Sequence, residues 1–140
     1  MPLLYLSPLS GDAQHTLRGG IPVLFPQFAD RGPLKKHGFA RDMPWLLLED
    51  STHADGHRLV FELKIQQGDC PDWLNSANLV LTTQLTPNAL KICLLVRNSG
   101  STQFAWTGGL HPYLHTDDLC ASQLLACRAP LCKIDTIQAG

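Results

Sequence analysis

Positively charged side chains gather in a loop-rich stretch of the N-terminal third. The segments LRGGIPVLFPQF and GPLKKHGFARDMPW carry Arg18, Lys35, Lys36, His37 and Arg41 among glycines and prolines. A guanidinium donates two parallel, charge-assisted hydrogen bonds to a phosphate or a carboxylate. Prolines restrict a loop, so that its side chains lose less entropy when a ligand binds. We therefore expect this stretch to bind a compact anion.

A structural role for the same residues is the alternative. Arg18 and Arg41 could pair with Asp12, Asp30 or Asp42, and the glycines could simply form turns. The residue types alone leave these two interpretations open.

Proton transfer is the chemistry that a second segment, GGLHPYLHTDD, could perform. His111 and His115 are four residues apart, and Asp117 and Asp118 follow. Histidine donates or accepts a proton near neutral pH. An H-x-x-x-H spacing holds a metal on a helix, but Pro112 argues against a helix here. On a strand the two histidines share a face about 13 Å apart, which is too far for one metal without a bend.

Two alternatives to a proton-transfer role remain for this segment. A metal-dependent β-barrel enzyme would use His111, His115 and Asp117 as ligands. In the structural alternative, His111 is a histidine of a loop or core whose ring is hydrogen-bonded by the backbone.

Tryptophans add a further possibility. Trp45, Trp73 and Trp106 could be platforms on which sugars stack, although tryptophans at period-two positions of a β-protein more often pack in the core or at its rim.

Composition bounds the class of protein. The chain has 140 residues, of which 44% are hydrophobic and 16% charged, and this favours one globular domain spanning 1–140. The net charge of −1 lacks the basic excess that binding of a phosphate backbone requires, so nucleic acid is not an expected partner. P-loop, G-x-S-x-G and Rossmann motifs are absent.

The pattern of apolar and charged residues along the chain also predicts where in the cell the protein is located. Apart from proline, the longest apolar run is Ile92 to Val96, far short of the roughly 20 residues of a transmembrane helix. The N-terminal MPLLYLSPLSGD has no basic region before its apolar stretch, so we expect no secretory signal and a cytoplasmic protein. Five irregularly spaced cysteines predict reduced thiols.

The elements that must position these residues are predicted to be strands. Apolar residues alternate with polar ones from Arg58 to Gln67, which indicates a half-buried strand. Leu79–Leu85 and Leu90–Arg97 alternate in the same way around Thr86-Pro87-Asn88, which predicts a hairpin. The fold class is therefore all-β, part of an antiparallel β-sandwich.

Other segments are less regular. We expect further strands at Leu3–Leu6, Met43–Glu49 and Gln103–Leu114, the last bent at Gly108-Gly109, and mostly loop over residues 7–42. Residues 119–140 form an atypical tail, in which Leu119 to Arg128 suits a helix and a strand almost equally.

Three motifs in order, RGGIPVLFPQF, HGFARDMPW and GLHPYL, resemble the aldose 1-epimerase-like proteins, specifically the glucose-6-phosphate 1-epimerases or D-hexose-6-phosphate mutarotases. With LYLSP at residues 4–8, the resemblance covers residues 4 to about 118. It implies the galactose mutarotase-like fold, a large antiparallel β-sandwich. It also implies interconversion of the α and β anomers of hexose 6-phosphates without a cofactor.

Roles for individual residues follow from the same resemblance. It implies that Arg18 and Arg41 contact the substrate phosphate, that His37 lines the pocket and that His111 is the catalytic histidine. In the family the catalytic base is a glutamate far toward the C-terminus, beyond the last residue of this chain.

The position of that glutamate affects the expected activity. Glu49 and Glu62 lie outside the motifs and are not expected to replace the base. We therefore expect reduced activity or none from the isolated chain, and a possible homodimer that covers open sheet edges. A non-catalytic remnant that binds phosphosugars is the alternative function.

Overall fold

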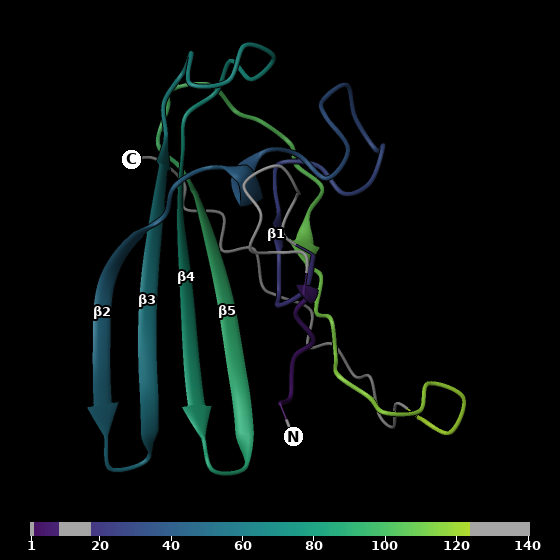
Figure 1. Ribbon diagram of the computed structural model, residues 1–140. Helices are drawn as coiled ribbons and strands as arrows, with labels where there is room; N and C mark the ends of the chain where they lie inside the picture. Colours follow the sequence, from purple (N-terminus) through teal and green to yellow (C-terminus); the bar gives the residue numbers. More distant parts are fainter. Residues whose placement is uncertain (1, 9–17, 124–140) are drawn as a thin grey trace.

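A four-stranded antiparallel meander makes up most of the regular structure (Figure 1). The computed structural model describes residues 2–8 and 18–123. Neighbours in the chain pair in the order β2-β3-β4-β5, and the strands are β2 (Leu46–His53), β3 (Gly56–Ile65), β4 (Ala77–Thr86) and β5 (Ala89–Asn98). The all-β, antiparallel prediction is confirmed, and so is the hairpin, whose strands face each other in register from Ala77↔Asn98 to Thr86↔Ala89.

A second, much smaller layer lies beside this sheet (Figure 1). Its two strands, β1 (Val23–Leu24) and β6 (Gly109–Leu110), pair antiparallel. Isolated bridges, Leu4↔Leu114 and Leu6↔Gly19, extend it toward the N-terminus. A 3-10 turn, η2 (Ala40–Asp42), contacts β1. The motif residues lie in this layer and in the loops around it.

The hydrophobic core lies at one end of the large sheet. Val23 and Phe25 of the small layer pack with Leu63 and Ile65 near the end of β3 and with Leu79 near the start of β4. Each of these side chains is at most 5% exposed. Toward the opposite end of the sheet, Leu85 is 53% exposed. The small layer therefore covers only part of the inner face.

The predicted strand over Gln103–Leu114 was wrong except at β6. The backbone of this segment bonds to an irregular loop, with Thr107 N–H donating to Pro26 O, His111 N–H to Pro22 O and Tyr113 N–H to Gly20 O. Without a regular partner, an apolar period-two pattern yields an extended segment and not a ladder. The Leu3–Leu6 strand is likewise reduced to its two bridges.

The predicted strand at Met43–Glu49 begins and ends later, at Leu46–His53. Before it, the indole Nε1 of Trp45 donates to Ala40 O over 2.9 Å, which ties this stretch of chain to η2. Within β2 the register shifts between Leu47 and Glu49, so that Leu48 is an extra residue.

The described part of the tail forms a turn, in which Asp118 Oδ1 accepts from the N–H groups of Cys120 and Ala121. The rest of the predicted segment Leu119–Arg128, together with Asp12, Cys127 and Cys132, lies outside the described residues. Cys70, Cys93 and Cys120 are free thiols. Within residues 2–8 and 18–123, no helix has the length and apolar character needed to cross a membrane.

Candidate active site

A buried glutamine shapes the loop that carries the first basic cluster. Gln27 is 2% exposed, and its amide donates to Ala29 O and Leu34 O while its Oε1 accepts from Leu34 N–H. A buried amide needs hydrogen-bond partners, and Gln27 finds them in the backbone of the loop. These bonds hold the loop closed around the side chain. A β-carbon at Gly32 would contact the Gln27 amide, so the loop has no room for a side chain there.

His37 lies at the end of this loop in an unusual backbone conformation. Its φ is 70° and that of Ala29 is 49°, both in the left-handed region that non-glycine residues rarely adopt. The two residues bond reciprocally: His37 N–H donates to Ala29 O over 3.0 Å, and Ala29 N–H donates to His37 Nδ1 over 3.2 Å. An acceptor at Nδ1 leaves the proton of the neutral ring on Nε2.

The rings of His37 and His111 contact each other across the small layer. Their centroids are 6.3 Å apart and their planes cross at 74°. Phe28 borders His37 at 5.8 Å and Tyr113 borders His111 at 4.8 Å. The structure thus brings together the two histidines that the resemblance singled out.

The positive charge of Arg41 affects the protonation of His37. Burial lowers the pKa of His37, and the positive charges of Arg41 and Lys36 lower it further. The Nε of Arg41 is buried with no hydrogen-bond partner, while its Nη2 donates to Lys36 O over 3.4 Å. The Arg41 side chain is 24% exposed, so solvent reaches part of this positive charge beside a histidine that favours its neutral form.

Nearby carboxylates do not neutralise Arg41 through hydrogen bonds. Asp42 lies 3.9 Å from its Nε, an ion-pair distance, but Asp42 is bound more closely by Lys35 at 2.6 Å. Asp30 lies 4.0 Å from Lys36. The pairing of Arg41 with Asp42 that the structural alternative expected is therefore present, as an ion pair without a hydrogen bond.

Arg18 reaches the small layer through its backbone. Its carbonyl accepts from Ser7 N–H over 2.8 Å, and two residues later Gly20 O accepts from Tyr113 N–H. A β-carbon on the intervening Gly19 (φ 128°) would contact Tyr5 O, so close backbone approach requires glycine there. Arg18 itself is exposed and begins the segment that runs beside Tyr113.

Both glutamates of the chain are engaged elsewhere, on the large sheet. Glu49 accepts from Ser51 and Arg58, and the hydrogen bond from Ser51 is the main cause of its lowered pKa. Glu62 accepts from Asn78 over 2.9 Å, which likewise lowers its pKa. A carboxylate stabilised in this way is a weak base, in keeping with the expectation that neither replaces the family's glutamate.

A metal site is the remaining alternative for the second motif. No group of three or more His, Cys, Asp or Glu side chains that could hold a metal occurs within residues 2–8 and 18–123. His115 instead lies along the N-terminal segment, where its N–H donates to Leu3 O.

Sequence reasoning missed three contributors to this site, Gln27, Phe28 and Tyr113. All three lie within the quoted motifs, but only charged and histidine side chains were assigned roles there. A polar residue amid the apolar run VLFPQF was a usable signal, because a buried glutamine must find hydrogen-bond partners.

Comparisons with known proteins identify the family of the chain. Residues 13–136 match the family model described as aldose 1-epimerase. Over 105 residues the chain is 31% identical to a protein of Salmonella typhimurium and 33% identical to one of Escherichia coli, both named "Putative glucose-6-phosphate 1-epimerase".

The fold of the chain is also similar to solved structures. The Slr1438 protein from Synechocystis sp. PCC 6803 superposes with a TM-score of 0.69 at 34% identity over 81% of this chain and 43% of its own. YeaD of Salmonella typhimurium, described as a putative mutarotase, superposes with a TM-score of 0.67 at 30% identity over 80% of this chain and 37% of its own. The chain spans about a third of the length of the curated relatives it matches, 34% in both cases.

Proposed function

Because the chain belongs to the aldose 1-epimerase family, we propose that it carries the anion-binding and acid-catalytic half of a site that interconverts the α and β anomers of hexose 6-phosphates. The observation that carries the proposal is the contact between His37 and His111, with Arg41 close enough to lower the pKa of His37. Side chains from two of the motifs, His37 and Arg41 from one and His111 from another, thus lie together.

The reaction needs one acid and one base. Opening of the pyranose ring requires a proton at the ring oxygen and removal of the proton from the C1 hydroxyl. The C1–C2 bond then rotates, and the ring closes on the other face of the carbonyl. His111 is exposed and so reachable by substrate, and a histidine placed in this way contributes roughly 10² to 10⁴ in rate.

His37 and the arginines bind the substrate in this proposal. His37 is a neutral ring whose Nε2–H can donate to a phosphate or hydroxyl oxygen, because Nδ1 already accepts from Ala29. The partly exposed guanidinium of Arg41 supplies a charged donor for the phosphate. Arg18, on the segment beside Tyr113, is assigned to the same phosphate.

We assign the base to neither glutamate of this chain. Glu49 and Glu62 are its only glutamates, and both are held by partners on the large sheet. This observation favours the second candidate function, a phosphosugar-binding module with little or no turnover of its own. A carboxylate from another part of the assembly would then complete the acid-base pair.

Exchange spectroscopy tests the proposal. NMR measures the exchange rate between the anomers of glucose 6-phosphate with the 140-residue chain, and glucose is the uncharged control. Acceleration confined to the phosphorylated sugar supports an isomerase, and binding without acceleration supports the module. If the chain neither binds nor accelerates exchange of glucose 6-phosphate, the proposal is wrong.

The location and assembly of the protein follow as further parts of the proposal. Phosphorylated sugars are charged and do not cross membranes unaided, so the protein acts in the cytoplasm. A second copy of the chain covers the open edges of the large sheet, because unpaired edge strands with exposed apolar side chains favour association.

A further inference from the structure

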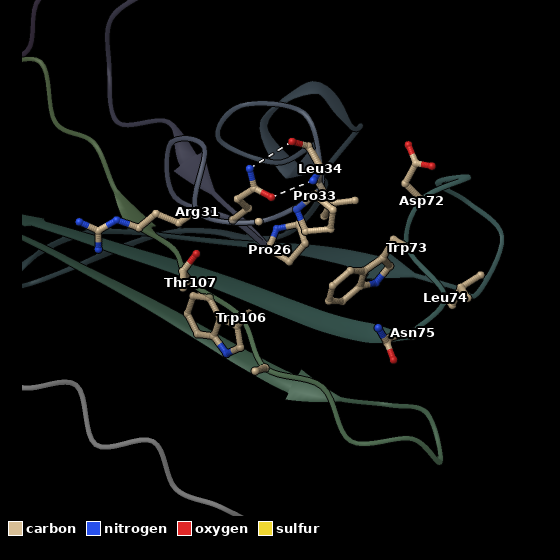
Figure 2. A pocket seen from close by; sticks show the side chains of 13 residues that line it. Pro26, Arg31, Pro33, Leu34, Asp72, Trp73, Leu74, Asn75, Trp106 and Thr107 are labelled. Carbon is tan, nitrogen blue, oxygen red and sulfur yellow. Dashed lines mark hydrogen bonds between the residues drawn. The ribbon is translucent and has the colours of Figure 1, made fainter.

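A cavity of about 460 Å³ lies apart from the histidine pair. Residues of 26–27, 31–34, 72–75 and 105–107 line it. Gln27, which shapes the loop before His37, is among them, and His37, Arg41 and His111 are not. Its volume lies within the range of roughly 300 to 1,000 Å³ that small-molecule sites have. Figure 2 shows Trp73 and Trp106 entering it from different segments near Pro26.

The indole of Trp73 is a buried donor without an acceptor. The residue is 7% exposed, and its ring packs edge to face against Phe25 and Phe104 at 5.8 and 5.0 Å. Its Nε1 is fully buried and has no hydrogen-bond partner. Trp45, in contrast, donates its Nε1–H to Ala40 O. An unpaired buried N–H costs free energy, so an acceptor in the cavity would stabilise this arrangement.

Polar side chains without described hydrogen-bond partners line the same cavity. The indole nitrogen lies on the side of Asn75, and Asp72 is at the same end of the cavity (Figure 2). Neither Asp72 nor Asn75 forms a hydrogen bond or ion pair with a residue that the structure describes. Arg31 is at the opposite end, with its guanidinium 5.6 Å from the Phe28 ring.

We propose that this cavity binds an uncharged sugar ring, at a site separate from the one around His111. The apolar C–H face of a pyranose packs on an indole such as that of Trp106. A ring hydroxyl oxygen accepts from Trp73 Nε1–H, and neighbouring hydroxyls donate to Asp72 and Asn75. An anion would meet the unpaired Asp72 carboxylate, and a purely apolar ligand would leave the indole N–H without an acceptor.

The indole N–H signals of the full chain test this site directly. The probe is methyl α-D-glucopyranoside, which has no phosphate and cannot change anomer, so that binding is separated from the proposed isomerase reaction. In ¹⁵N-labelled protein we expect a saturable shift of the Trp73 indole signal, with the Trp45 signal unmoved as an internal control. Trp73→Phe and Trp45→Phe assign the two signals.

Variants separate the two sites. Asn75→Ala and Asp72→Asn change side chains that form no hydrogen bond or ion pair with a described residue, so the fold is kept while affinity for the glucoside falls several-fold. Arg41→Ala should leave that affinity unchanged. If the Trp73 signal does not move, if Trp45 moves equally, or if Arg41→Ala abolishes the shift, the cavity is not a sugar site. Failure of anomer exchange with glucose 6-phosphate would leave this inference standing.

Discussion

The backbone N–H of Ala29 donates to Nδ1 of His37, while the N–H of His37 donates to the carbonyl of Ala29. This reciprocal pair holds two residues in left-handed conformations and determines which ring nitrogen of His37 carries the proton. The site therefore contains a hydrogen-bond donor at His37 Nε2, and nearby positive charge favours the neutral form of that ring.

His37 should titrate below the ordinary histidine value of 6.5, because burial and then Arg41 and Lys36 lower its pKa. The unfolded chain therefore binds a proton that the folded chain holds less readily. His37 should thus contribute to a loss of stability as the pH falls below 6.5. NMR titration of the ring checks the midpoint. Bound phosphate should raise the His37 midpoint, and a midpoint above 6.5 without ligand would contradict the assignment.

Substitutions of His111 and Arg41 should separate turnover from binding. His111→Ala removes the proposed acid and should lower any exchange of glucose 6-phosphate by about 10² to 10⁴, with little change in affinity. Arg41→Ala should weaken binding of glucose 6-phosphate and leave the weak binding of glucose unchanged. Calorimetry and anomer exchange measure the two effects, with His53→Ala as a matched control. Equal loss of affinity in both site variants would assign His111 to binding alone.

Gln27→Ala should destabilise the whole chain, since it removes three hydrogen bonds from a buried position and leaves their backbone partners unpaired. We expect a loss of about 2 to 4 kcal/mol in the free energy of unfolding. Gln84→Ala is the control, because Gln84 makes one exposed hydrogen bond to Asp55. Denaturant unfolding gives both values, and equal losses would show that Gln27 does not organise the loop.

A charged residue on an open edge strand should oppose self-association. Leu95 on β5 is 51% exposed, and Leu95→Lys places a charge on the strand that a second copy would meet. We expect the variant to shift the protein toward monomer in sedimentation velocity. Lys91→Ala, also on β5, serves as the control that removes a charge. A wild-type chain that is monomeric at all concentrations would contradict the proposed dimer.

Prediction from the sequence succeeded where local pattern and pairing coincide. The hairpin of β4 and β5 has both period-two alternation and a Pro87-Asn88 turn, so its register follows from neighbouring residues. The contact between His37 and His111 depends on long-range pairing of irregular segments, which no local pattern encodes. The motifs suggested both residues through resemblance, but their contact and the role of Gln27 required the fold.

The extended segment from Thr107 to Tyr113 failed as a strand prediction for the same reason. Its backbone bonds to Pro26, Pro22 and Gly20, which are residues of a loop. The β-propensity of this segment favoured a strand. Its backbone path is irregular because its hydrogen-bond partner in the fold is a loop.

The one-sided position of the core means that protection from solvent exchange should vary along each long strand. Backbone amides near Ile65 and Leu79 are anchored beneath the small layer, whereas those near Leu85 belong to a ladder with an exposed end. Opening can therefore begin at the hairpin tips and proceed inward without disturbing the aromatic cluster around Phe25. The large sheet is thus held in place at the end that packs against the small layer. The segments that hold the histidines are attached to that same end.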